Sequence, residues 1–197
     1  MNKFIFTFFI ASLLVSFYSF TPRHITTAKV DTAASTIEWT ARKVTGQHNG
    51  TVAIKEGELK INHGVLAGGS FTMDMTSIIV TDLQGGGKTK LEGHLKSNDF
   101  FSVDSFPTAK LVITKATHEG EGIHHVKADL TIKGITKPIE FHATVKEEGE
   151  LFKATANITV DRSLYNVRYG SGKFFQNLGD STIYDEFDLT VTLVAGS

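Results

Sequence analysis

The stretch ADLTIKGITKPIEFHATV, residues 128–145, decides the fold class of this chain. Apolar and polar side chains alternate on both sides of a break at Lys133-Gly134. The apolar positions are Ala128, Leu130 and Ile132 before the break and Ile139, Phe141, Ala143 and Val145 after it. Alternation with period two places one kind of side chain on one face of a β-strand. The stretch therefore predicts two half-buried strands separated by a turn.

The same alternation recurs through most of the chain. It is found in residues 37–41, 71–75, 109–113, 152–160 and 183–193. Breaks rich in glycine and glutamate, at residues 119–122 and 147–150, separate neighbouring runs. We therefore expect an all-β fold built from many short strands.

One segment departs from the alternation. Residues 88–96 contain good helix formers, and Leu91 and Leu95 share a face at i,i+4 spacing. We predict a short helix across one end of the sheet. Many strands with one helix fit a closed antiparallel barrel, which has no free sheet edges. Periodicity alone leaves a two-sheet sandwich open.

The first 28 residues have the pattern of a secretory leader. They contain no acidic residue, and Lys3 precedes an apolar run from Phe4 to Phe20. This run is borderline in length for a membrane-spanning helix, which needs about 20 apolar residues. We expect a signal peptide at residues 1–28, with retention as an N-terminal anchor as the alternative. Residues 29–197 are expected to form one domain.

Composition excludes several classes of function. The chain has no cysteine, which removes disulfides, thiolate nucleophiles and cysteine-ligated zinc. Loss of the leader cations Lys3 and Arg23 changes the net charge from −1 to −3. Nucleic-acid binding needs a concentrated basic surface, so we expect no nucleic-acid partner.

Three motifs suggest chemistry, and each lacks an essential part. Gly87-Lys88-Thr89 resembles a phosphate loop, but Asp82 stands where that motif has its first glycine. The adjacent His124-His125 point to opposite faces of a strand, and no tetrahedral metal set is evident. Gly170-Ser171-Gly172 does not have the spacing of a nucleophile elbow. We predict no catalytic residue, no metal and no cofactor.

Two further motifs carry a family resemblance. One is the run from His94 to Phe101, HLKSNDFF, followed by Ser105-Phe106-Pro107; the other is DLTIKGITKP, residues 129–138. Together they resemble the YceI-like family, lipocalin-like bacterial proteins that hold long-chain isoprenoids and related lipids. The resemblance covers residues 30–194. The chain departs from the family pattern at Leu91-Glu92, in place of Arg-Asp, and at Tyr165-Asn166, in place of Phe-Gly.

The resemblance implies an extended eight-stranded antiparallel lipocalin-like barrel with a short helix near its mouth. It also implies a periplasmic or secreted protein that binds, transports or stores a long-chain amphipathic lipid without enzymatic chemistry. The lipid would be a polyisoprenoid, an isoprenoid quinone or a fatty-acid-like molecule. The alternatives are an enzyme or enzyme accessory acting on such a lipid, and a ligand-free structural or stress-response protein of the envelope. A homodimer is possible, and membrane contact is expected only through an uncleaved leader or transient lipid exchange.

Large apolar side chains on inward faces and beside loops are the candidates for a lipid-binding lining. They are Trp39, Phe71, Met73, Met75, Leu91, Leu95, Phe100, Phe101, Phe141, Phe152, Ile158, Phe174 and Phe175. Methionine adapts to irregular shapes, which suits a slot for a flexible chain. Arg162, Tyr165 and Tyr169 are the candidates for contact with a polar head group.

Overall fold

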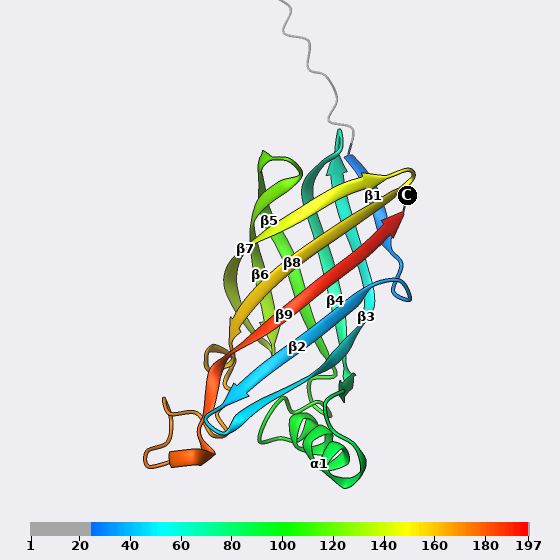
Figure 1. Ribbon diagram of the computed structural model, residues 1–197. Helices are drawn as coiled ribbons and strands as arrows, with labels where there is room; N and C mark the ends of the chain where they lie inside the picture. Colours follow the sequence, from blue (N-terminus) through cyan, green and yellow to red (C-terminus); the bar gives the residue numbers. More distant parts are fainter. Residues whose placement is uncertain (1–24, 197) are drawn as a thin grey trace, which may run out of the picture.

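The computed structural model describes residues 25–196, which form strands with one short helix (Figure 1). The predicted leader lies outside these residues except for its last four. Those four residues, 25–28, belong to the first strand, and Ala28 is fully buried. The elements are β1 (Ile25–Val30), β2 (Thr36–Lys43), β3 (Gly46–Asn62), β4 (Val65–Val80), α1 (Gly85–Lys96), β5 (Thr108–Gly120), β6 (Ile123–Ile132), β7 (Ile135–Glu148), β8 (Leu151–Asp161) and β9 (Ile183–Gly196), with single 3₁₀ turns η1 (Arg162–Tyr165) and η2 (Gly179–Ser181).

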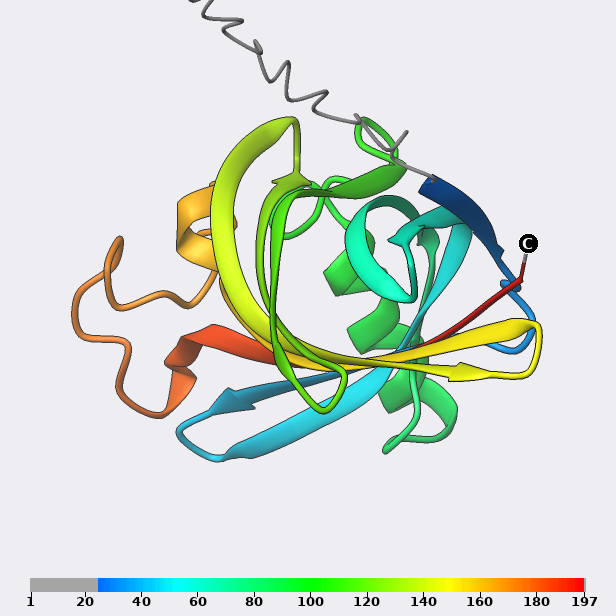
Figure 2. The same ribbon diagram turned by 90° about the horizontal axis from the view of Figure 1, so that it is seen from above.

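The strands close into an antiparallel barrel with eight strand positions, as the sequence predicted (Figure 2). Strands β2 to β9 each pair with their neighbours in the barrel, and β2 closes the ring by pairing with both β3 and β9. β1 continues the position of β2, because it pairs with the other halves of β3 and β9. The Oγ of Ser35 bridges the interruption: it donates to the carbonyl of Asp31 at 2.6 Å and accepts from the N–H of Val194 at 3.0 Å.

The two ends of the barrel differ. At one end, the hairpin end, the chain turns tightly between β3 and β4, between β5 and β6, and between β7 and β8. The other end, the helix end, carries α1, the segment 97–107 and the long connection 162–182 (Figure 1). Figure 1 shows α1 lying across the barrel opening, and this position agrees with its contacts to β4.

Each run of alternating residues is a strand, and the predicted turns lie between strands. The predicted helix is also present, but it begins at Gly85 rather than at Lys88. Glycine is unfavourable in a helix, so the propensity argument excluded the first turn. Glu92 holds α1 in place, because its carboxylate accepts the N–H of Val80 at the end of β4, at 2.8 Å.

Gly50 is needed for the close approach of three strands. A Cβ at this position would lie 1.9 Å from the carbonyl oxygen of Ile79 and 2.5 Å from the ring of Trp39. The backbone oxygen cannot rotate away as a side chain could. The barrel therefore requires glycine at this point of β3.

We predict that Gly50→Ala destabilises the protein by about 1–3 kcal/mol, the usual cost of overpacking, or by more because the obstacle is backbone. Gly93→Ala is the matched control. Gly93 lies in α1 with nothing within 4 Å of an added Cβ, so alanine should stabilise the helix by about 1 kcal/mol. Urea unfolding of both variants measures the two effects. Equal effects would show that β3 and β4 do not approach as closely as described.

Candidate functional site

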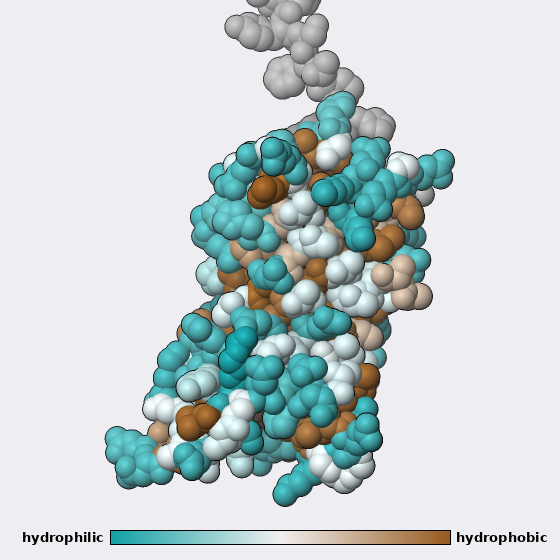
Figure 3. Space-filling view, viewed as in Figure 1, coloured by the Kyte–Doolittle hydropathy of each residue, from teal (hydrophilic) through white to brown (hydrophobic). Residues whose placement is uncertain are grey.

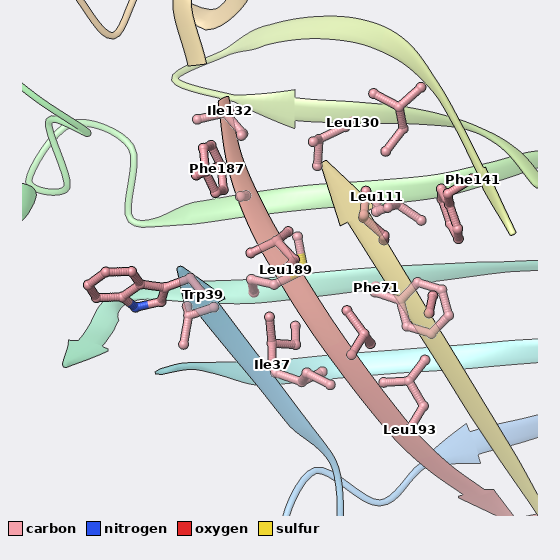
Figure 4. A pocket seen from close by; sticks show the side chains of 18 of the residues that line it. Ile37, Trp39, Phe71, Leu111, Leu130, Ile132, Phe141, Phe187, Leu189 and Leu193 are labelled. Carbon is pink, nitrogen blue, oxygen red and sulfur yellow. The ribbon is translucent and has the colours of Figure 1, made fainter. Parts of the chain in front are cut away.

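The barrel encloses an apolar cavity of about 170 Å³ (Figure 4). Thr155, Arg162 and Tyr184 are the lining residues with polar groups, together with the indole N–H of Trp39. That N–H donates to the carbonyl of Thr51 at 3.3 Å, so it is already satisfied. The interior thus offers hydrocarbon contact over nearly all of its surface.

The strand periodicity builds this lining. On β4, Phe71, Met73 and Met75 all contact the cavity, while the intervening Asp74 bonds outside to the N–H and hydroxyl of Thr76. On β9 the inward side chains are Phe187, Leu189, Val191 and Leu193 (Figure 4). Successive side chains of a strand point to opposite faces, so each alternating run contributes one row.

The space exists because several inward positions carry small side chains. Alanine faces the cavity at residues 41, 109, 143, 154 and 156. An eight-stranded barrel is just wide enough to be filled by side chains or to hold one small ligand. Larger residues at these positions would fill the interior, and the alanines leave it open.

The size and the apolar lining of the cavity suit a small apolar group better than water. An apolar cavity of roughly 150 Å³ in another protein stays dry and accepts benzene. The open volume here is similar, so it takes an apolar group of that size directly. A longer chain needs side chains to move, and Met73 and Met75 have three rotatable bonds each.

A buried histidine links two strands at the hairpin end. His124 is 1% exposed, and its Nδ1 lies 2.9 Å from the carbonyl of Gly122. Its Nε2 accepts the N–H of Leu66, a lining residue, at 3.2 Å. Burial lowers the pKa of His124, which keeps the ring neutral and able to accept that hydrogen bond.

Arg162 organises the helix end. Its guanidinium is 3% exposed, lines the cavity and lies over the ring of Phe100, 5.4 Å from the ring centre. It donates to the carbonyls of Val167, Ile183 and Tyr184 at 2.9, 3.0 and 3.2 Å. Burial lowers the pKa of Arg162, whereas the nearby Asp185 and Asp161 raise it. Three of its N–H groups therefore hold the connection 162–182 against β9, and this role is structural.

The structure brings ten of the sixteen predicted residues together around the cavity. They are Trp39, Phe71, Met73, Met75, Leu95, Phe100, Phe101, Phe141, Ile158 and Arg162. Their contact with a lipid remains a prediction.

The other six lie outside the lining. Leu91 packs against the core beside the cavity, and Phe152 is buried in the core beyond the lining residues of β8. Tyr165 is 1% exposed with no partner for its hydroxyl among the described residues. Tyr169 is half exposed, with its ring 4.3 Å from that of His94. Phe174 and Phe175 are exposed on the connection 162–182.

The prediction missed much of the lining. The row on β9, Ile37 on β2 and the alanines were not among the candidates. The alternation of residues 183–193 was a usable signal for the β9 row. The alanines gave no such signal, because a small apolar residue is also common in filled cores.

Within residues 25–196, no group of three or more histidine, aspartate or glutamate side chains is placed to hold a metal ion. Over the same residues, no helix has both the length and the apolar character required to cross a membrane.

This architecture, a closed eight-stranded antiparallel barrel with one short helix and an apolar interior, is that of the lipocalin-like class. The model of the YceI-like domain matches residues 29–195. The chain belongs to the YceI-like family, which confirms the resemblance read from the two motifs.

Local sequence similarity to curated relatives is moderate. A UPF0312 protein of Pseudomonas putida (strain W619) is 44% identical over 57 residues, which cover 29% of this chain and 30% of that protein. A UPF0312 protein of Photorhabdus laumondii is 40% identical over 57 residues and 29% of each chain. The chain thus spans less than a third of the length of these relatives.

Solved structures confirm the fold over most of the chain. BcnA of Burkholderia cenocepacia has a TM-score of 0.68 at 22% identity, covering 84% of this chain and 99% of that one. A polyisoprenoid binding domain from Saccharophagus degradans has a TM-score of 0.63 at 12% identity, covering 86% and 98%. At these identities the likeness is one of fold.

We predict that Arg162→Met costs about 3–5 kcal/mol, because it removes the ion-pair partner of Asp185, 3.4 Å away, and leaves three carbonyls without donors. Arg42→Met is the control. Arg42 also pairs with a carboxylate, that of Asp188 at 2.6 Å, but both side chains are largely exposed. An exposed pair contributes about 0–1 kcal/mol. Urea unfolding of the two variants gives the comparison, and equal losses would contradict the structural role of Arg162.

Proposed function

We propose that the protein binds the hydrocarbon part of a long-chain amphipathic lipid inside its barrel and carries or stores the lipid without altering it. The observation that carries the proposal is the continuous apolar cavity. Its lining on β9 runs from Ile183 to Leu193, roughly 33 Å along the strand. With a typical barrel tilt this is about 25 Å along the axis. An elongated apolar ligand fits such a space better than a compact polar one.

Hydrocarbon burial alone supplies useful affinity. Each CH₂ group moved from water into an apolar slot contributes about 0.8 kcal/mol, so ten contribute about 8 kcal/mol. That corresponds to a dissociation constant near 1 μM, before the cost of ordering the chain is subtracted. Few polar contacts are then needed. A polyisoprenoid, an isoprenoid quinone and a fatty-acid-like chain all satisfy this requirement.

The polar groups at the cavity support a carrier rather than an enzyme. Catalysis by nucleophile or general base needs two such groups within hydrogen-bond reach. Arg162 is committed to backbone carbonyls, and Trp39 to that of Thr51. Family membership supports the same reading, since a fold neighbour is described as a polyisoprenoid binding domain.

The leader pattern supports a periplasmic or secreted location. Processing before Ile25 would leave β1 intact, whereas processing after Ala28 would remove four of its six residues. We therefore propose that the mature protein begins between Phe20 and Ile25.

Organic extraction of gently purified protein, followed by mass spectrometry, should recover a lipid with a long apolar chain. Incubation of the protein with that lipid should leave its mass unchanged. A changed mass, at a rate proportional to protein concentration, would favour an enzyme. Recovery of no lipid, with no binding of added lipids of the three classes, would contradict the proposal.

Met73→Trp should reduce lipid occupancy strongly while the protein still melts cooperatively, because indole fills the cavity. Thr72→Trp is the matched control, since Thr72 is the next residue on β4 and does not line the cavity. Leu95→Asp should likewise weaken binding more than Lys115→Asp on the outer wall. Loss of thermal stability with unchanged occupancy would assign Met73 and Leu95 to a ligand-free core.

A further inference from the structure

Large apolar side chains are exposed around the helix end, close to the cavity. We call this set the aromatic rim: Phe106, Leu164, Tyr169, Phe174, Phe175 and Tyr184, which are 37–52% exposed. Such exposure is too high for core residues. Figure 3 shows apolar side chains at the surface of this end, among polar ones. Exposed apolar side chains that gather in one region mark sites of interaction with a partner or a membrane.

A chain of contacts links Phe106 to Phe174 within the rim. The ring of Phe106 lies against Gly134 in the turn between β6 and β7, where an added Cβ would be 3.1 Å from it. Lys133, which precedes Gly134 in the chain, donates through Nζ to the carbonyl of Asn166 at 3.2 Å. The Oδ1 of Asn166 accepts from Nε of Arg168, and that guanidinium lies 4.9 Å from the ring centre of Phe174.

The rim carries two neighbouring cations without counter-ions. Between residues 25 and 196, neither Lys133 nor Arg168 forms an ion pair with a carboxylate. The two cations are close, because both donate to Asn166. Burial lowers the pKa of Lys133, and the charge of Arg168 lowers it further. The chain has no acidic residue from Ser163 to Gly179. Two adjacent unpaired cations favour an anionic partner.

The rim is continuous with the cavity. Tyr184 belongs to both, since it is 52% exposed and also lines the interior. Its carbonyl accepts a hydrogen bond from Arg162, another lining residue. A chain leaving the barrel at this end would therefore pass directly onto the exposed aromatic side chains.

We propose that the aromatic rim docks on the surface of a bilayer that contains anionic lipids, with Phe174 and Phe175 at the acyl boundary and Lys133 and Arg168 at the phosphates. Aromatic residues are enriched at membrane interfaces, and basic residues close to an anionic surface add to binding. Docking in this orientation opens the barrel toward the membrane. The statement that lipid enters or leaves there rests on the proposed function, whereas docking itself does not.

Co-sedimentation with vesicles tests the docking. Protein recovered from the envelope is mixed with vesicles of phosphatidylcholine alone, or of phosphatidylcholine and phosphatidylglycerol in equal parts. We expect preferential binding to the second kind. Lys133→Gln with Arg168→Gln should weaken that binding about fivefold for each charge removed. Phe174→Ser with Phe175→Ser should weaken it by about tenfold or more.

Two double variants serve as matched controls. Ile123→Ser with Leu151→Ser removes exposed apolar side chains at the hairpin end, and Lys115→Gln with Lys153→Gln removes cations from the barrel wall. Both should bind vesicles as the unchanged protein does. Any contribution from the leader is the same in every variant, so it does not affect the comparison. Melting temperatures identify variants that fail to fold.

The outcomes separate the two proposals. Lipid occupancy should not change in the Phe174 and Phe175 variant, because neither side chain lines the cavity. Lipid that co-purifies with a protein that does not bind vesicles would overturn the docking and leave the carrier function standing. Docking by a protein that holds no lipid would overturn the carrier function and leave the docking standing. Equal losses of vesicle binding in the rim variants and the control variants would overturn the assignment of the aromatic rim as the docking surface.

Discussion

Closure of the hydrogen-bonded sheet is the constraint on which the rest of the structure depends. Eight strand positions fix the width of the barrel, and each strand is hydrogen-bonded to a neighbour on both sides. The break between β1 and β2 interrupts one strand position of the ring. Ser35 bridges this break through its side-chain hydroxyl. Since the chain has no cysteine, closure and the apolar interior must supply stability without disulfides. Once the width is set, the side chains alone decide whether the interior is filled.

The two ends then take different roles. At the hairpin end, neutral His124 joins β6 to β4. At the helix end, α1 lies across the end of the barrel and the connection 162–182 runs beside it (Figures 1 and 2). Arg162 holds that connection against β9 through backbone carbonyls. Arg162 therefore supports the fold, and its contact with a ligand head group stays a prediction.

The sequence predicted the barrel and the helix because both depend on local periodicity and on two motifs. It did not predict β3, where glycine at 50 and 57 interrupts the pattern and where the need for Gly50 comes from Trp39 and Ile79. Most of the cavity lining was not predicted either. Its alanines were hidden because alanine leaves space only in relation to what lies opposite. Phe174 and Phe175 were assigned to the lining on their size and their position beside a loop. Their exposed placement depends on the path of the connection 162–182, which no local pattern encodes.

The central claim is that a lipid chain lies inside the barrel, and the single tryptophan of this chain can report on it. Trp39 lines the cavity and is 8% exposed, so solutes in water reach it poorly. A lipid with bromine atoms on its apolar chain should quench Trp39 fluorescence in a saturable manner, with one lipid per protein. The same lipid without bromine should compete for the site and restore the emission. Binding of the brominated lipid without quenching would place the chain outside the barrel and contradict this account.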